Sequence, residues 1–208
     1  MENREVVIVA LGSSSTAGWR ASNVADSYPA QLQADLSAAL PAAHVALINR
    51  GVGGQDAKQE LPRLDRDVVG IRPTVVIWQV GANGAMRDMN PDIFRALVDI
   101  GVRRLQHAKI DVVLMDNQQA PKILASPGHV KIDQALADVA VATGAGLFAR
   151  STLMDQWKVA GFPYADFVAD DGLHHNDHGY ACVARALAQA IVDGLGPAPV
   201  SGNAIAGR

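Results

Sequence analysis

Short runs of apolar residues alternate along this chain with longer stretches in which apolar and polar positions are mixed. The runs lie at residues 6–11, 45–48, 75–80, 112–115 and 146–148, and most of them are rich in β-branched side chains. Continuous apolar runs of this length are typical of strands that are buried on both faces of a parallel sheet. The pattern therefore predicts five parallel strands.

Between these runs, apolar positions recur every three or four residues, which is the spacing of amphipathic helices. The predicted helices cover residues 28–40, 57–69, 91–108, 129–143 and 178–195. Alternation of strands and helices favours a doubly wound α/β fold with right-handed crossovers. We expect a three-layer α/β/α, flavodoxin-like architecture around a five-stranded parallel sheet, with sites at the carboxyl ends of the strands.

The chain has 208 residues, of which 49% are hydrophobic and 19% charged, which suits one domain with a sizeable core. We assign residues 1–195 to this domain and residues 196–208 to a flexible or docked tail. The first apolar run is far too short to cross a bilayer, so no membrane contact is expected. The sequence as given suggests a soluble cytoplasmic protein, and a periplasmic or secreted location stays open if a leader was removed.

The charge balance and the cysteine count narrow the classes of partner. The net charge is −3 and no run of Lys or Arg occurs, which argues against nucleic acid and favours a small-molecule partner. Cys182 is the only cysteine, so the chain can form neither an internal disulfide nor a Cys-rich zinc site. We expect Cys182 to fill space on the last helix, and a homo-oligomer stays open.

The loops after the predicted strands are rich in small and polar residues. Residues 12–18 are Gly-Ser-Ser-Ser-Thr-Ala-Gly, residues 49–54 are Asn-Arg-Gly-Val-Gly-Gly, and residues 81–84 are Gly-Ala-Asn-Gly. Near the last helix, residues 170–176 are Asp-Asp-Gly-Leu-His-His-Asn. These loops supply a serine hydroxyl, backbone N–H groups, an asparagine amide and a carboxylate three residues from an imidazole. Acyl transfer to a serine needs these groups, because an imidazole must accept the hydroxyl proton and N–H donors must stabilise the oxyanion.

These blocks, in this order, resemble the SGNH (GDSL-type) hydrolase family of esterases and lipases over nearly the whole domain. The family block G-D-S-x-T is similar to residues 12–16, the second-block glycine falls on Gly54, the block G-x-N-D on residues 81–84 and D-x-x-H on residues 171–174. The resemblance implies a catalytic triad of Ser14, His174 and Asp171. It also implies an oxyanion hole formed by Ser14, Gly54 and Asn83.

The sequence departs from the family pattern at two positions. Ser13 replaces the aspartate that usually precedes the nucleophile, and Gly84 replaces the aspartate that usually follows the asparagine. Neither missing carboxylate accepts the nucleophile's proton in the family mechanism, so the chemistry should survive. The properties that the two replacements could change are the rigidity of the loop and the electrostatics around Ser14.

A metal site is the main competing interpretation of the histidine-rich loop. His174 and His178 are four residues apart and lie among several aspartates, but the glutamate of an H-E-x-x-H motif is missing. A water-activating metal would also leave Ser14 and Asn83 without a purpose, so we predict no metal and no other cofactor. We expect His175 and His178 to be solvated or to cap the last helix, whose N-cap is Asn176 or Asp177.

Four aromatic residues complete the candidate set. Trp78 lies within an apolar run and is expected in the core, whereas Trp19, Phe162 and Tyr164 lie on loops that border the site blocks. We expect these three to wall the pocket for the acyl or the alcohol group.

The resulting hypothesis is a serine esterase that removes short acyl groups, chiefly acetyl, through an acyl-enzyme. A small domain has little chain for a lid or a long acyl tunnel, and the resemblance suggests acetylated carbohydrates as substrates. Two alternatives stay open. An acyl thioesterase or lysophospholipase would need an apolar groove leading away from Ser14, and an inactive ester- or glycan-binding module would have a broken triad.

Overall fold

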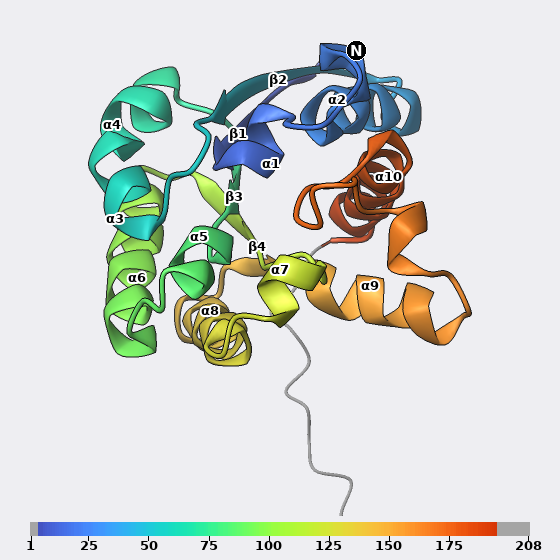
Figure 1. Ribbon diagram of the computed structural model, residues 1–208. Coiled ribbons are helices and arrows are strands. Elements are labelled where there is room, and N and C mark those ends of the chain that lie inside the picture. The colour runs from blue at the N-terminus through green and yellow to red at the C-terminus, as the bar shows by residue number, and fades with distance from the viewer. Residues whose placement is uncertain (1–3, 195–208) are drawn as a thin grey trace, which may run out of the picture.

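A computed structural model describes residues 4–194, which form a central sheet between two layers of helices (Figure 1). All strand pairs in the sheet are parallel, and the strand order is β2-β1-β3-β4-β5. The predicted three-layer, flavodoxin-like fold with five parallel strands is thereby confirmed. The predicted tail, residues 196–208, lies outside the described residues. The strands are β1 (Arg4–Gly12), β2 (Ala43–Gly51), β3 (Val75–Gln79), β4 (Asp111–Met115) and β5 (Gly146–Phe148).

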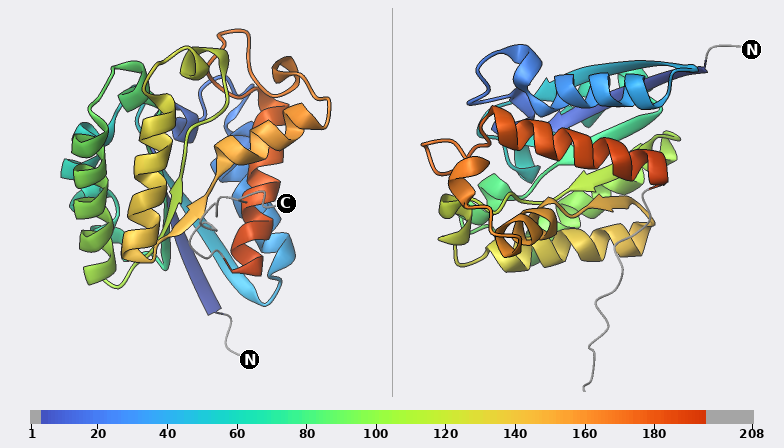
Figure 2. Two further views of the ribbon diagram at one scale, coloured as in Figure 1. Left: turned by 90° about the horizontal axis from the view of Figure 1, so that it is seen from below. Right: turned by 90° about the vertical axis from the view of Figure 1, so that its right-hand side faces the viewer.

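Successive side chains of the central strands face opposite helical layers, because side chains alternate along a strand. In β3, Val76 and Trp78 belong to one buried cluster and Ile77 to the other. The first cluster includes residues of α6 (Pro91–His107) and α8 (His129–Thr143), and the second includes residues of α2 (Tyr28–Ala39) and α10 (Asp177–Asp193). Figure 2 shows the two helical layers on either side of the sheet. Burial on both faces explains why the strands are continuously apolar.

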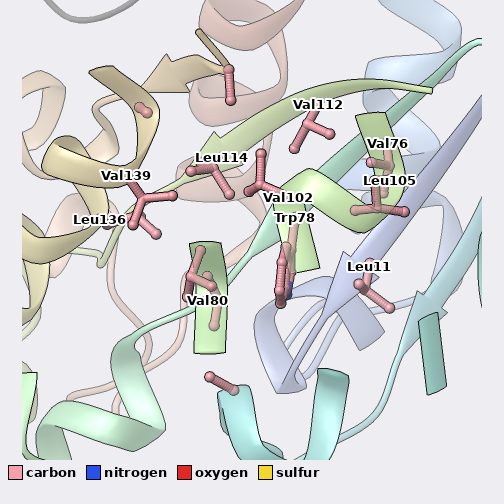
Figure 3. Packing of buried hydrophobic residues seen from close by; sticks show 14 of the residues in the cluster. Leu11, Val76, Trp78, Val80, Val102, Leu105, Val112, Leu114, Leu136 and Val139 are labelled. Carbon is pink, nitrogen blue, oxygen red and sulfur yellow. The ribbon is translucent and has the colours of Figure 1, made fainter. Parts of the chain in front are cut away.

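Trp78 lies at the centre of the larger cluster and is fully buried, as predicted (Figure 3). Helix α6 passes so close that a Cβ atom at Gly101 would lie 2.5 Å from the indole ring, so only glycine fits there. The indole Nε1 donates a hydrogen bond of 2.8 Å to Oε2 of Glu60. Burial raises the pKa of Glu60 to about 8, although the bond from Trp78 and the charge of Arg63 act in the opposite direction.

The predicted continuous helix over residues 57–69 is wrong. The segment is divided into α3 (Ala57–Glu60), the 3-10 turn η2 (Leu61–Arg63), α4 (Leu64–Asp67) and the 3-10 turn η3 (Val69–Ile71). Pro62 accounts for the interruption, because proline lacks the N–H group of the helical ladder and its ring collides with the preceding turn. The broken segment still buries Leu64 and Val68 against the sheet.

Several short helices were not expected from the sequence. Helix α9 (Arg150–Val159) buries only Arg150 and Met154, so its apolar pattern is weak. Single turns also follow the carboxyl ends of β1, β3 and β4, where they shape the loops rather than cover the sheet. They are α1 (Ser14–Ala17), α5 (Ala82–Met86) and α7 (Pro121–Leu124). The 3-10 turn η1 (Val24–Asp26) lies between α1 and α2, and the 3-10 turn η4 (Tyr164–Asp166) lies between α9 and α10.

The last helix agrees with its predicted start. Asn176 is the N-cap of α10, and its side chain accepts a hydrogen bond of 2.8 Å from the backbone of Gly179. Cys182 lies on this helix, half-buried beside a small apolar cluster. Among the helices of residues 4–194, none combines the length and apolarity that a membrane crossing requires.

Candidate active site

The candidate residues meet where the strand order reverses. Strands β2 and β3 lie on opposite sides of β1, so the chain leaves the sheet in opposite directions after β1 and after β3. Ligands of open α/β sheets bind at such a switch point, outside the carboxyl ends of the strands. Ser14 begins α1 directly after β1, and Asn83 lies in α5 directly after β3. In Figure 1, α1 lies beside β1 and α5 lies near β3.

The structure brings Ser14, His174 and Asp171 into one hydrogen-bonded chain. Nε2 of His174 lies 2.7 Å from Oγ of Ser14, although 160 residues separate them along the chain. Nδ1 of His174 lies 2.6 Å from Oδ2 of Asp171. An ionised carboxylate can only accept, so Nδ1 carries the proton and Nε2 is left to accept one from the serine hydroxyl. This is the geometry in which an imidazole can act as a general base.

A compact turn fixes Asp171 beneath the imidazole. Its second oxygen, Oδ1, accepts the backbone N–H groups of Leu173 at 2.9 Å and His174 at 3.0 Å. Partial burial would raise the pKa of Asp171, but hydrogen bonds from the His174 ring and from the two backbone N–H groups outweigh it and lower the pKa to about 2. Asp171 is therefore ionised at neutral pH.

The loop of residues 20–22, from the N-terminal half of the chain, contacts the same turn. Arg20 forms an ion pair with Asp170, and its Nε atom lies 3.6 Å from Oδ2 of Asp171. The backbone of Arg20 has a φ of +69°, in the left-handed region that non-glycine residues seldom occupy. Nearby, the backbone N–H of Ser22 donates a bond of 2.8 Å to Asp177. Residues 20–22 thus connect the segment that follows Ser14, the candidate nucleophile, to the turn that carries His174 and to the start of α10.

Gln79, the last residue of β3, holds the loop of the candidate nucleophile. Its Oε1 atom accepts hydrogen bonds from the Ser13 backbone at 3.2 Å, the Ser13 hydroxyl at 3.1 Å and the Thr16 hydroxyl at 3.3 Å. Ser13 is buried, and a hydroxyl at this position donates where the usual aspartate would only accept. Gln79 could not be identified from the sequence, because a polar residue at the end of an apolar run does not indicate which distant residues it contacts.

The candidate oxyanion donors are held by a second set of contacts. Asn83 donates through Nδ2 to the carbonyl of Gln55 over 2.8 Å, which joins the loops after β2 and β3. Gly54 has a φ of +78°, which a residue with a Cβ atom rarely adopts, and its carbonyl accepts a bond of 2.7 Å from Arg87. Arg87 is held in turn by Asp56 at 2.8 Å. Neither Arg87 nor Asp56 was expected from the sequence.

The three predicted pocket aromatics separate into two groups. Trp19 lies at the site: its ring centroid is 5.9 Å from that of His174, and its side chain is 58% exposed. The ring of Phe162 instead packs edge-on against Phe167, with centroids 6.2 Å apart, and Tyr164 lies beneath the ammonium group of Lys158. The structure does not bring Phe162 and Tyr164 to Ser14 through these contacts, so their role in binding substrate stays a prediction.

The expectation that His175 is solvated or capping is wrong. His175 is fully buried, its Nδ1 atom lies 3.1 Å from the carbonyl of Phe167, and burial lowers its pKa to about 3. It therefore packs as a neutral ring behind His174. His178 is exposed and bonds to the carbonyl of Asp166 through Nδ1 at 3.0 Å. The two nitrogens of His174 are engaged by Asp171 and Ser14, so the ring does not pair with His178 as a ligand set.

The fold and the site together define the class of the protein. A serine after β1, a glycine after β2, an asparagine after β3 and an Asp-x-x-His turn before the last helix, on this strand order, are the features of SGNH (GDSL-type) proteins. The sequence matches the model of the Non-GDSL lipase-like family over residues 1–197, and the chain belongs to this family. The resemblance predicted from the motifs is confirmed.

Solved structures show the same fold at low sequence identity. An acetylxylan esterase from Geobacillus stearothermophilus, solved as a catalytic mutant, is 17% identical with a TM-score of 0.74, and the match covers 92% of this chain and 94% of that one. The lipase/acylhydrolase from Enterococcus faecalis is 24% identical with a TM-score of 0.77, covering 93% and 99%. A two-domain esterase active on acetylated mannans is 22% identical with a TM-score of 0.78, covering 92% and 49%. No curated protein matches the chain.

Proposed function

We propose that this protein is a serine esterase that hydrolyses short-chain carboxylic esters, acetyl esters of carbohydrates foremost, through a Ser14–His174–Asp171 triad. The observation that carries the proposal is the hydrogen-bonded chain from Ser14 Oγ to His174 Nε2, at 2.7 Å, and from His174 Nδ1 to Asp171 Oδ2, at 2.6 Å. Serine is a poor nucleophile at its ordinary pKa, and an oriented imidazole is the group that activates it.

In the first half-reaction, Ser14 Oγ attacks the ester carbonyl while its proton passes to His174 Nε2. Asp171 stays ionised and stabilises the imidazolium that forms. The tetrahedral intermediate then collapses, the C–O bond to the alcohol breaks, and His174 returns the proton to the leaving alcohol. The product of this step is an acyl-enzyme on Ser14.

In the second half-reaction, water takes the place of the alcohol. The water oxygen attacks the acyl carbonyl while His174 Nε2 accepts a proton from the water. The second tetrahedral intermediate then collapses, the bond between the acyl carbon and Ser14 Oγ breaks, and His174 returns the proton to Oγ as the carboxylic acid leaves. The same side chain thus serves as base and as acid in each half. No cofactor is required by this sequence of steps.

Three N–H groups are proposed to stabilise the oxyanion of both intermediates: the backbone amides of Ser14 and Gly54 and the side-chain amide of Asn83. Ser14 is the first residue of α1, where backbone N–H groups have no partner within the helix. Arg87 donates a hydrogen bond to the carbonyl of Gly54 and so fixes the peptide plane that follows this glycine. The carbonyl of Gln55 accepts from the side-chain amide of Asn83 and fixes its orientation. Donors that are fixed in advance stabilise developing charge without reorganisation.

The packing beside the site supports short acyl groups. Ala82, next to Asn83, and Leu173, next to His174, belong to a cluster of apolar side chains that pack on one another, including Ile123 and Met154, which are 1% and 2% exposed. The buried members of this cluster pack against each other and therefore offer no wall to a long acyl chain. The acetyl-ester activities named for the structural relatives above favour acetylated carbohydrates over other esters.

The test of this proposal is the Ser14→Ala variant assayed with p-nitrophenyl acetate. We expect turnover to fall by several orders of magnitude, because the acyl acceptor is removed, and the thermal transition to stay unchanged, because a small residue is replaced by a smaller one. A serine-directed phosphonate should label Ser14 in a peptide map. If Ser14→Ala keeps more than about a tenth of the wild-type turnover while Ser13→Ala or Ser15→Ala loses it, the nucleophile is assigned to the wrong residue.

A further inference from the structure

The loop after β4 carries four consecutive polar side chains that are all buried and that take no part in the proposed chemistry. They are Asp116, Asn117, Gln118 and Gln119. Burying a polar group lowers the stability of the folded state unless the group is hydrogen-bonded, so each of the four side chains is expected to have a hydrogen-bond partner. Gln118, which is only 2% exposed, has its partners on two separate elements of the fold.

The Gln118 amide bridges a buried arginine and the turn that carries the candidate acid and base. Its Oε1 atom accepts a hydrogen bond of 2.8 Å from Nη2 of Arg150, and its Nε2 atom donates one of 3.0 Å to the carbonyl of Leu173. Arginine has only donors and a carbonyl only accepts, so this orientation of the amide is the one that satisfies both neighbours.

Arg150 is itself immobilised at the end of β4. The residue is fully buried, and its Nε and Nη2 atoms donate to the carbonyl of Asp116 at 3.2 and 2.7 Å. A guanidinium in a rigid fork geometry loses little further freedom when it binds a third group. Arg150 therefore fixes the direction in which the Gln118 amide points.

Leu173 lies between Asp171 and His174, so its carbonyl belongs to the four-residue turn that carries both. The preceding carbonyl, that of Gly172, accepts the backbone N–H of Lys122 at 3.0 Å. Two successive carbonyls of the turn are thus held by residues 118–122. The contacts of Asp171 Oδ1 lie within the turn and fix its shape, whereas the bonds from Gln118 and Lys122 fix its place relative to the sheet.

We propose that Gln118 is a positioning residue for the proposed hydrolysis, which holds the Asp171–His174 turn through the Leu173 carbonyl and so sets the distance from His174 to Ser14. Arg150 acts behind it by orienting the amide. The inference rests on the proposed esterase function only for its kinetic readout. A misplacement of reacting groups by about 1 Å can lower the rate by about 10².

Two variants distinguish a role of Gln118 in placing the Asp171–His174 turn from a role limited to accepting the hydrogen bond of Arg150. Gln118→Met keeps the length of the side chain and removes both hydrogen bonds. Gln118→Glu keeps an acceptor for Arg150 but places a carboxylate oxygen, ionised beside that guanidinium, against the Leu173 carbonyl. Gln119→Met is the matched control on the same loop: it is also buried, and its Oε1 atom has no hydrogen-bond partner among the described residues.

The variants should be compared at pH 8 for kcat and KM on p-nitrophenyl acetate, for thermal stability, and for the low-field NMR resonance of the His174 Nδ1 proton. We expect both Gln118 variants to lower kcat by about 10 to 10² with KM within about twofold, and to displace the resonance. Gln118→Glu should be the more stable of the two, and Gln119→Met should behave like the wild type.

Recovery of wild-type kcat and of the wild-type resonance in Gln118→Glu would show that Gln118 only satisfies Arg150, and would overturn the inference. So would a folded Gln118→Met variant with both readouts unchanged. The resonance requires no turnover. If the wild-type protein hydrolyses no ester, the proposed function fails, while the resonance still decides whether Gln118 places the turn.

Discussion

The side-chain amide of Asn83 donates one hydrogen bond, 2.8 Å long, to the main-chain carbonyl of Gln55. An amide nitrogen carries two hydrogens, so this bond orients the group and leaves its second N–H available for an oxyanion. The same bond ties the loop of Gly54 to the loop of Asn83. Two of the three proposed donors are therefore placed relative to each other before any substrate binds.

From this arrangement we predict that Asn83→Ala lowers kcat by about 10²–10³ with little change in KM, the range found when one oxyanion donor is removed. Asn83→Asp should be at least as damaging, because its carboxylate would face both the Gln55 carbonyl and the oxyanion. Steady-state kinetics on p-nitrophenyl acetate checks both variants. A rise in KM alone would make Asn83 a binding residue and contradict the oxyanion role.

The five strands and the candidate triad residues could be predicted from the sequence, because each rests on a local pattern. Apolar runs specify buried strands, and the three-residue spacing of Asp171 and His174 fits within one turn. The sequence also contains the signal for the interruption, because Pro62 lies within the helical spacing of residues 57–69. Propensity and periodicity compete at such points, and the proline decided the outcome.

The support around the site could not be predicted, because it depends on contacts between distant segments. Gln79, Arg87 and Gln118 hold main-chain atoms that lie 66, 33 and 55 residues away along the chain, and nothing in their immediate sequence indicates these partners. His175 shows the same limit, because its neighbour His174 faces Ser14 while His175 is fully buried. Local sequence gives the residue types of a site, and the tertiary fold decides which of them meet.

Trp19 and Phe162 should respond differently to truncation. The exposed indole of Trp19 beside His174 offers an apolar face to a sugar ring, so Trp19→Ala should raise KM for acetylated xylo-oligosaccharides by roughly 3- to 10-fold and change KM for p-nitrophenyl acetate less. Phe162→Ala should lower thermal stability, since its ring packs on Phe167, and should change KM less than Trp19→Ala does. A larger KM effect for Phe162→Ala than for Trp19→Ala would place the alcohol pocket near Phe162.

The buried pair of Glu60 and Trp78 predicts a pH-dependent stability. The folded-state pKa of Glu60, about 8, lies above its ordinary value of 4.5, so its contribution to stability is complete below about pH 4.5 and is lost as the pH rises through 8. Between pH 5.5 and 7.5 the wild type should lose about 1.4 kcal/mol of unfolding free energy per pH unit relative to Glu60→Gln. Glutamine still accepts from Trp78 but does not titrate. Urea unfolding of both proteins at these pH values measures the difference, and parallel profiles would show that Glu60 is ionised in the folded state.

Acyl-chain length provides the sharpest test of the proposed substrate class. Each methylene buried in an apolar groove contributes up to about 0.8 kcal/mol, so an enzyme with such a groove prefers longer esters. Here the apolar side chains around Ala82 and Leu173 are packed against one another, and additional methylenes should find no wall. We expect kcat/KM on p-nitrophenyl esters to be highest for acetate or propionate and to fall beyond butyrate.

Acetylated sugars, acyl thioesters and lysophospholipids measured in parallel supply the comparison of substrate classes. A maximum at octanoate or longer, together with turnover of thioesters or lysophospholipids above that of acetylated sugars, would favour the thioesterase or lysophospholipase alternative.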